Sequence, residues 1–437
     1  MTTTETLPAA QPAAAAPSQR LTSVDALRGF DMFWIMGADS LAYALHRLSP
    51  GGPTKFLADQ LEHAEWEGFH FYDLIFPLFV FLAGVSLVFS LTKAIETAGR
   101  AAAIKRVLRR GVLLFIIGII YSGGFTRSWP DIRLMGVLNR IALAYTFAGL
   151  FFCFFKPRAL MGIFAGLLIG YWALMTFVPI RDIQLTRSNI ANLAEKDGNT
   201  RAANLLWDGP NPSTVRNSPA WAEAEKVFNA TTNRVTGKFG KGYNVCDHFD
   251  FQYLPGKKYD NFFDPEGYLS TIPAIGTCLL GVFAGFLLRN QSVEGKRKVI
   301  YLIGAGVAAA LLGWCWNYQF PVVKKIWSSS YVLVAGGYSA VLLGFFYWIV
   351  DVQGRSGWCR PFIWMGMNSI TVYLASNLMG GGGWVKLGQR FAGGDVHSFL
   401  DSQVHRGMGD TLVSVVGLAL AFWFCYFLYK RKIFLRL

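Results

Sequence analysis

The sequence predicts an all-α polytopic membrane protein with about ten transmembrane helices, both termini in the cytoplasm and one large extracytoplasmic loop. Three observations predict this fold class. Of the 437 residues, 53% are hydrophobic and only 16% are charged, whereas a soluble domain carries about 25% charged residues. Apolar runs of about helix length recur along the chain. Lys and Arg gather in alternate short connections, as they do on the cytoplasmic side of membrane proteins.

Ten apolar runs are each expected to cross the membrane as a helix, because lipid offers no partner to an unpaired backbone group. They cover 27–46, 70–92, 109–122, 133–155, 159–179, 268–289, 298–316, 330–351, 360–380 and 411–430. The third run is short, and we expect it to begin within the basic stretch Lys105–Arg110, whose long side chains can reach the interface. The first five runs belong to segment 21–180 and the last five to segment 268–437.

Two parts of the chain lie outside the membrane in this prediction. Residues 1–20 are rich in Ala, Pro and Thr and hold no aromatic residue, so we expect a disordered tail rather than a signal peptide. Segment 181–267 carries 11 Lys and Arg against 11 Asp and Glu, and its aromatic residues favour a small lid over a pure linker. The net charge of +14 therefore lies outside this loop, which indicates membrane orientation rather than nucleic-acid binding.

The six cysteines are scattered singly, without a CxxC pair. This pattern predicts neither a zinc site nor a disulfide framework. Whether Cys246 in the loop pairs with Cys315 near a helix end stays open.

Ionisable groups inside membrane helices are costly, so each is a functional candidate. Asp25 and Arg28 near the start of the first helix are spaced i, i+3 and can pair on one helical face. A structural ion pair at the interface is the alternative. Asp39 follows Asp25 by 14 residues, about 21 Å at the rise of an α-helix, so it lies near the outer end of the same helix.

The segment before the second run places two histidines, a tryptophan and a carboxylate at helical spacing. His63, Trp66, His70 and Asp73 fall at offsets 0, 3, 7 and 10, which share an arc of about 80° if the helix begins early. Asp39, at the top of the neighbouring helix, is placed to meet them. A carboxylate beside an imidazole orients the ring as a general base. The alternative is that the Trp and His residues only anchor the helix at the interface.

Polar islands recur at other helix ends. They are Asn139–Arg140, Asp264–Gly267, Asn317, Lys324–Ser328 and Met367–Ser369. Asp264 and Glu266 are expected to cap the sixth helix, where a carboxylate meets the positive end of the helix dipole. Asn368 and Ser369 lie within a run, where they either join helices by hydrogen bonds or line a water-filled tunnel.

Six blocks follow one another along the chain in a recognisable order. They are RLTSVDALRGFDMFW, EHAEWEGFHFYDLIFPLFVFLAGVS, MGVLNRIALAY, FDPEGYLSTIPAIGTCLLGVFAG, PVVKKIWSSSYVL and MGMNSITVYL. With these blocks the chain resembles the heparan-α-glucosaminide N-acetyltransferase family, and more closely its bacterial NagX-like members, from about residue 20 to the end. The second block is the most specific.

The resemblance implies a membrane-bound transferase that uses cytosolic acetyl-CoA to acetylate an amino sugar such as glucosamine on the far side of the membrane. The family's active histidine lies in a K-H-A-S-W-N-G stretch that matches residues 62–68, so the role falls on His63. An active-site asparagine of the family falls on Asp39, a departure that makes the site more acidic. The resemblance also implies a homodimer in the bacterial inner membrane. Segment 181–267 has no matched counterpart, so the acceptor stays open.

The reaction implied is attack of an amine on a thioester. Neutral His63 suits a general base or a covalent acetyl carrier, with Asp39 orienting its ring. The candidates for acceptor binding are Trp66, His70, Asp73, Glu266 and Trp327. The candidates for binding acetyl-CoA are Arg28, Lys105, Arg106, Arg109, Arg110, Asn139, Arg140, Asn368 and Ser369, and orientation bias alone is the alternative for the basic cluster among them. No metal is expected. The alternative function is a transporter for an amino sugar or related solute, without acyl transfer.

Overall fold

The computed structural model describes residues 21–435 apart from 127, 197, 208–217 and 379–382. The disordered tail predicted for residues 1–20 lies outside the described residues. The described chain is mostly helical, and its strands are β1 (Ile180–Arg181) and β2 (Arg234–Val235), paired antiparallel with Ile180 opposite Val235. The all-α prediction is therefore confirmed.

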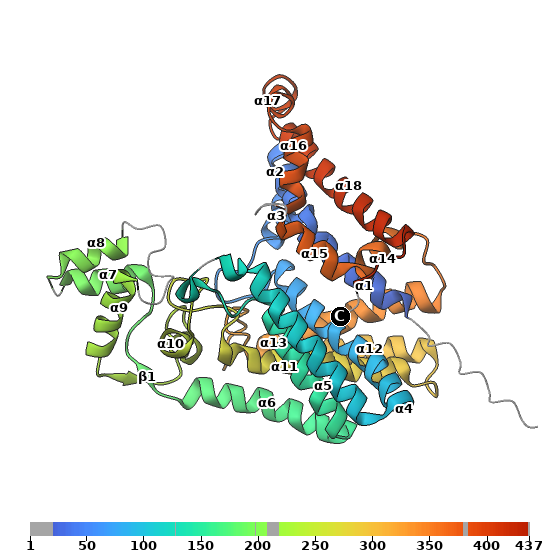
Figure 1. Ribbon diagram of the computed structural model, residues 1–437, viewed down its shortest axis with the longest axis horizontal. Coiled ribbons are helices and arrows are strands. Elements are labelled where there is room, and N and C mark those ends of the chain that lie inside the picture. The colour runs from blue at the N-terminus through green and yellow to red at the C-terminus, as the bar shows by residue number, and fades with distance from the viewer. Residues whose placement is uncertain (1–20, 127, 197, 208–217, 379–382, 436–437) are drawn as a thin grey trace, which may run out of the picture.

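Seven helices of the described chain are long and apolar enough to cross a membrane. They are α4 (Tyr72–Tyr121), α5 (Val137–Phe154), α6 (Pro157–Phe177), α11 (Tyr268–Arg289), α12 (Gly295–Trp316), α13 (Ser329–Phe346) with its π-helical end η5 (Tyr347–Val352), and α18 (Met408–Lys430). Helices α4, α5, α11 and α13 pack side by side around one apolar core (Figure 1). The prediction of a polytopic membrane protein is confirmed, whereas the count of ten helices stays a prediction.

Helix α4 is a hairpin rather than one rod. Its backbone leaves the helical region at Gly99 (φ 81°, ψ 172°), a left-handed conformation that glycine adopts without strain. Arg106 Nη1 then donates to the carbonyl oxygen of Ser90 at 3.4 Å, although 16 residues of straight helix would span about 24 Å. The chain therefore turns back at Gly99, and the two arms correspond to the second and third predicted runs.

Two predicted membrane helices are interrupted. The first consists of α1 (Thr22–Phe33), the π-helix η1 (Trp34–Ala38) and α2 (Asp39–Leu48), with a break at Gly37 (φ 123°). The ninth consists of α14 (Arg360–Met367) and α15 (Ser369–Leu378), separated at Asn368. Helices α1 and α14 touch at Gly29, where a side chain would collide with the backbone of Phe362. Small residues allow this close approach between helices.

The shorter elements connect these helices. They are α3 (Gly52–Gln60), η2 (Gly124–Thr126), η3 (Trp129–Asp131), α16 (Gly383–Ala392), α17 (Asp395–Phe399) and η6 (Leu400–Val404). Helices α16 and α17 form a tip with α2 and the start of α18 (Figure 1).

Segment 181–267 is folded. It contains α7 (Arg187–Lys196), α8 (Thr200–Trp207), α9 (Pro219–Ala230) and α10 (Val245–Tyr253), which lie at one end of the molecule (Figure 1). Its own hydrophobic core includes Trp221, Phe228, Phe251 and Phe262. Below we call this segment the lid.

The disulfide that the sequence leaves open is not formed. Cys246 and Cys315 are both free. Cys246 is buried in α10 of the lid, where its Sγ lies 2.9 Å from Tyr171 Oη.

Candidate active site

The chain from residue 62 to 71 is not helical, so the premise that placed four residues on one helical face is wrong. Helix α4 begins only at Tyr72, and Gly68 has φ 118°, which no helix accommodates. Instead the segment pairs with the loop between α12 and α13. Glu67 forms a β-bridge with Val323, and the Gly68 amide donates to the Val322 oxygen at 2.9 Å.

The fold-back of this segment brings His63 onto Asp73. The His63 Nδ1 lies 2.8 Å from Asp73 Oδ1. Asp73 Oδ2 accepts from the amides of Ala64 (3.1 Å) and His70 (3.0 Å). The Asp73 side chain is fully buried in the first turn of α4 while His63 is half exposed. With Nδ1–H donated to the carboxylate, Nε2 keeps its lone pair, which is the arrangement of an oriented general base.

Lys324 also belongs to this cluster. In the sequence it is part of the polar stretch Lys324–Ser328, in which no role is predicted for the lysine. Its Nζ lies 2.9 Å from Nδ1 and 3.1 Å from Nε2 of His63, and 3.4 Å from Asp73 Oδ1. The Lys324 side chain is 19% exposed. Burial lowers the pKa of Lys324, and Asp73 and Glu266 oppose that effect. The signal in the sequence is a pair of lysines, Lys324 and Lys325, within the otherwise apolar stretch from Pro321 to Trp327.

Asp39 does not meet His63 directly, which corrects the predicted pair. Asp39 Oδ2 accepts from Tyr72 Oη at 3.2 Å, and Oδ1 accepts from the Ser40 amide at 2.7 Å. The Tyr72 ring packs against the His63 ring with centroids 4.9 Å apart. Asp39 therefore reaches the histidine through Tyr72, and the carboxylate partner of His63 is Asp73.

A cavity of about 270 Å³ opens beside His63 and Lys324. Its walls come from α1, η1, α4, α5 and α15, and its polar lining includes Glu266 and Ser369. The uncharged residues predicted to bind acetyl-CoA lie in different surroundings. Ser369 lines the cavity, Asn139 Nδ2 donates to the Phe115 oxygen at 2.9 Å, and the buried side-chain amide of Asn368 has no hydrogen-bond partner among the described residues.

Four of the five predicted acceptor-binding residues, Asp73 among them, are absent from the described lining of this cavity. Trp66 Nε1 donates to the Phe239 oxygen at 2.7 Å and packs against the lid core. His70 Nδ1 lies 3.0 Å from the Glu62 oxygen. Trp327 is fully buried and donates to Thr277 Oγ1 at 3.1 Å.

Glu266 is held at the cavity by an arginine that the sequence analysis missed. Arg133 donates to Asp264 and to Glu266, each at 2.7 Å. Burial raises the pKa of Asp264 to about 6, and Arg133 opposes that effect. The predicted capping role is wrong, because the α11 terminus is capped by Asp250, which accepts from the Tyr268 amide at 3.3 Å.

Arg140 is a buried structural cation. It donates to the Pro265 oxygen at 2.6 Å and to Ser270 Oγ. Its guanidinium also lies 4.7 Å from the centre of the Trp327 ring. These contacts connect α5 to Pro265 at the end of the lid, to Ser270 in α11 and to the loop that carries Lys324.

The cations predicted to bind CoA are dispersed. Arg28 contacts Asp25 (3.3 Å) and Ser86 Oγ (2.6 Å), as the predicted ion pair requires. On the second arm of α4, Arg110 stacks 4.7 Å over the Tyr145 ring and Arg106 reaches the first arm. By contrast, Lys105 and Arg109 border an outward groove of about 580 Å³ lined mainly by aliphatic side chains.

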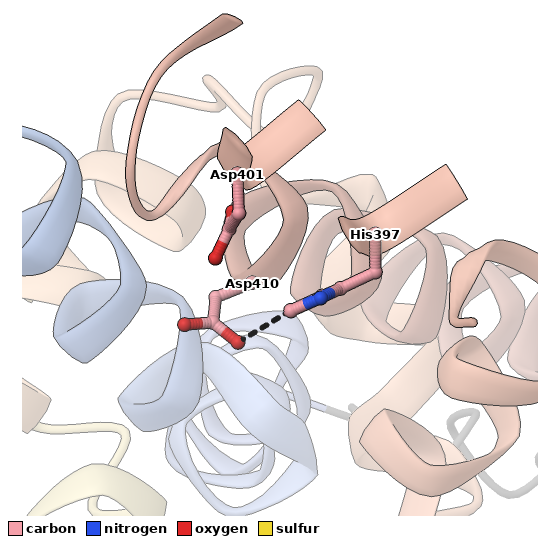
Figure 2. Close-up of side chains that lie close together, drawn as sticks. All are labelled: His397, Asp401 and Asp410. Carbon is pink, nitrogen blue, oxygen red and sulfur yellow. Dashed lines mark hydrogen bonds and ion pairs between the residues drawn. The ribbon is translucent and has the colours of Figure 1, made fainter. Parts of the chain in front are cut away.

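A separate cluster near the start of α18 has the residue types of a metal site. The potential ligand atoms of His397, Asp401 and Asp410 lie within 4.8 Å of one another (Figure 2). Each carboxylate already has a partner. Asp410 contacts His397 Nε2 (3.0 Å) and Arg47 (2.8 Å), and Asp401 accepts from the Gly409 amide (2.7 Å). This cluster shares no residue with the cavity at His63.

Comparison with known proteins supports the predicted resemblance. Residues 20–194 match the family model described as heparan-alpha-glucosaminide N-acetyltransferase, catalytic. The chain is 27% identical over 432 residues to heparan-alpha-glucosaminide N-acetyltransferase of Homo sapiens, covering 95% of this chain and 59% of that protein. It is 26% identical over 435 residues to the protein of that name from Mus musculus, covering 96% and 61%.

The chain thus spans about three fifths of the length of these relatives. The resemblance to this family is confirmed, and the closer likeness to NagX-like members stays a prediction. The matched region holds His63, Asp73 and the whole of α4, whereas Lys324 lies beyond it.

Proposed function

We propose that the protein is a membrane-bound acetyltransferase that moves an acetyl group from acetyl-CoA to the amine of an amino sugar. One observation carries the proposal. The imidazole of His63 is oriented by the buried Asp73 at 2.8 Å beside a cavity of about 270 Å³. The names of the two relatives specify the reaction class and support a glucosamine-like acceptor.

The chemistry requires removal of a proton from the attacking amine. Nε2 of His63 accepts this proton when His63 is the base, or attacks the thioester itself when His63 carries the acetyl group. Both routes need the neutral ring with Nδ1–H bound to Asp73. Both leave CoA as a thiol and the acceptor as an amide.

The arrangement across the membrane is part of the proposal. Ten helices with cytoplasmic termini put the turn of α4 at Gly99 inside and the lid outside. The 26 residues from Asp73 to Gly99 rise about 39 Å as a helix, which spans a bilayer core of about 30 Å. The nucleotide end of the donor then stays at the inner face, and its thioester reaches His63 through the bundle. A homodimer in the bacterial inner membrane remains part of this proposal by resemblance.

Cysteine-accessibility labelling tests the sidedness. A cysteine at the exposed Ala222 in the lid is expected to react from outside, and one at Ala102 beyond the α4 turn only from inside. The reverse pattern would place His63 in the cytosol and end the transmembrane part of the proposal.

A screen of amino sugars with purified protein and acetyl-CoA tests the reaction. The expected result is release of free CoA together with an acetylated sugar, identified by mass spectrometry. The competing function is solute transport, favoured by Asp31, a fully buried carboxylate whose two oxygens have no hydrogen-bond partner among the described residues. Uptake of an amino sugar into proteoliposomes without CoA release would favour the transporter.

A further inference from the structure

We propose that Lys324 is a catalytic residue whose ammonium donates a hydrogen bond to the thioester carbonyl oxygen as negative charge develops there. This inference rests on the proposed acetyl transfer. It concerns a residue outside the region that matches the family model.

The position of Lys324 suits this role. Among the described residues that line the cavity, it is the one with a Lys or Arg side chain. Its Nζ lies 3.1 Å from Nε2 of His63. A carbonyl group attacked beside Nε2 therefore lies within hydrogen-bond reach of the ammonium. A donor fixed before the reaction stabilises an oxyanion without having to reorganise.

The backbone around Lys324 is held in place. The Val323 amide donates to Ser328 Oγ at 3.1 Å, and the Trp327 amide donates to the Lys324 oxygen at 2.9 Å. The backbone oxygen of Val322, two residues before Lys324, accepts from the Gly68 amide. The loop that carries the lysine is thus hydrogen-bonded directly to the segment that carries His63, which places the two side chains next to each other.

The ion pair with Asp73 does not by itself explain why Lys324 lies at the cavity. Asp73 already accepts from Nδ1 of His63 and from two amides at 2.8–3.1 Å, whereas the Lys324 ion pair is longer, at 3.4 Å. Because Nδ1–H of His63 is donated to Asp73, the acceptors beside Nζ are Asp73 Oδ1 and Nε2 of His63, so one of the three N–H donors of the ammonium is available to a substrate oxygen. The charges that face Nζ are Asp73 and Glu266, with Lys325 adjacent in the chain, and burial lowers the pKa of Lys324.

The proposed step balances. The amine nitrogen attacks the thioester carbon, the C–N bond forms, and the carbonyl electron pair moves onto oxygen, where Lys324 donates to it. His63 Nε2 takes the amine proton. The oxyanion then collapses, the C–S bond breaks, and the CoA thiolate leaves with the proton from His63. Lys324 keeps its own protons throughout, and the same contact serves if His63 is the attacking nitrogen.

The test compares Lys324→Gln and Lys324→Arg with Lys325→Gln. Lys325 is a matched control, because it pairs with Asp260 at 2.6 Å and does not line the cavity as described. Loss of one such donor typically lowers kcat about 10²–10³-fold. We expect that loss in Lys324→Gln, with the affinity for free CoA unchanged. Lys324→Arg is expected to retain more of kcat because it still donates, and Lys325→Gln is expected to stay near wild type.

Each other outcome decides against the proposal. Near-normal kcat in Lys324→Gln overturns it, and so does an equal loss in Lys325→Gln or a loss of CoA affinity as large as the loss of kcat. If Lys324→Gln does not fold, Lys324→Arg is compared with Lys324→Met, and an arginine variant no faster than the methionine variant overturns the role. Failure of acetyl transfer itself is seen separately, as absence of CoA release by the wild-type protein.

Discussion

The histidine segment, residues 61–73, and the basic arm, Lys105–Arg110, are both rich in polar residues, but only the first gathers them at one point. His63 and Asp73 meet Lys324 from a distant loop within 3.4 Å. The histidine segment therefore contributes to one cluster beside the cavity, although its residues 62–71 are not helical.

The basic arm separates its cations, because successive side chains on a helix point about 100° apart. Residues four apart share a face. Arg106 and Arg110 accordingly lie toward the bundle, and Lys105 and Arg109 face the outward groove. Proximity in sequence therefore predicts proximity in space only where the backbone permits it.

The largest effect is expected for His63→Ala. Loss of a general base or nucleophile should reduce acetyl transfer by about 10²–10⁴-fold, while acetyl-CoA should still bind because the proposed arrangement places its nucleotide end far from His63. Product formation and a titration of acetyl-CoA binding measure the two quantities. The histidine control is His70→Ala, whose ring contacts the Glu62 oxygen. Near-normal transfer by a folded His63→Ala protein contradicts the assignment.

The next effect distinguishes the two carboxylates near His63. Asp73→Asn replaces an acceptor at Nδ1 by an amide that can present a donor, which favours the wrong tautomer. We expect kcat to fall on the order of 10²-fold. Assays at several pH values, with the fold checked by thermal unfolding, provide the measurement.

Asp39→Asn is the matched control for Asp73→Asn. Asp39 reaches the ring only through Tyr72, and the asparagine oxygen can still accept from the Tyr72 hydroxyl. The expected loss is less than about tenfold. If Asp39→Asn is as severe as Asp73→Asn, the carboxylate bound to the imidazole has been misassigned.

The stability of the lid is expected to depend on pH. Trp66 of the histidine segment packs against the lid, so its amide should report the same dependence. Burial raises the pKa of Asp247 to about 7 and that of Asp264 to about 6. Because these folded-state values exceed the unfolded value near 3.8, their contribution to stability is complete below pH 3.8 and is lost as pH rises through 6–7. His248, whose pKa burial lowers to about 4, opposes part of this loss between about pH 4 and pH 6.5, because there its unfolded form binds a proton that its folded form does not.

We therefore expect the lid to open more readily as pH rises from about 4 to about 7, by up to about tenfold per pH unit for each carboxyl that titrates, with no further change from these groups above pH 8. Hydrogen-exchange protection factors of lid amides, and of the amide of Trp66 that packs against the lid, provide the measurement. Asp247→Asn should flatten the dependence. Protection that rises with pH contradicts the assignment of these buried carboxyls.

Much of the fold is predictable from sequence because burial in lipid imposes a simple rule. The runs expected at 133–155, 159–179 and 268–289 correspond to α5, α6 and α11. The lid is less predictable, since its helices mix charged and apolar residues.

The site is only partly predictable. Spacing groups His63 with Asp73, and the structure also brings these two together, but the grouping assumes a helix that Gly68 (φ 118°) excludes. Lys324 is 261 residues from His63. The spacing of residues along one helix or strand cannot predict a contact between residues so far apart in the chain.

The smallest effects are expected in the basic arm, where the two faces should differ. The double variant Arg106→Ala/Arg110→Ala removes the two cations nearer the bundle and is expected to raise the KM for acetyl-CoA several-fold with little change in kcat, since each phosphate contact contributes about 1 kcal/mol. Lys105→Ala/Arg109→Ala removes the outward pair and equal charge, so it is the matched control and should leave KM unchanged. Steady-state kinetics at fixed ionic strength separates the faces. Equal increases in KM for the two double variants would mean that the basic arm attracts acetyl-CoA through its total charge. The difference between its two faces would then play no part in binding acetyl-CoA.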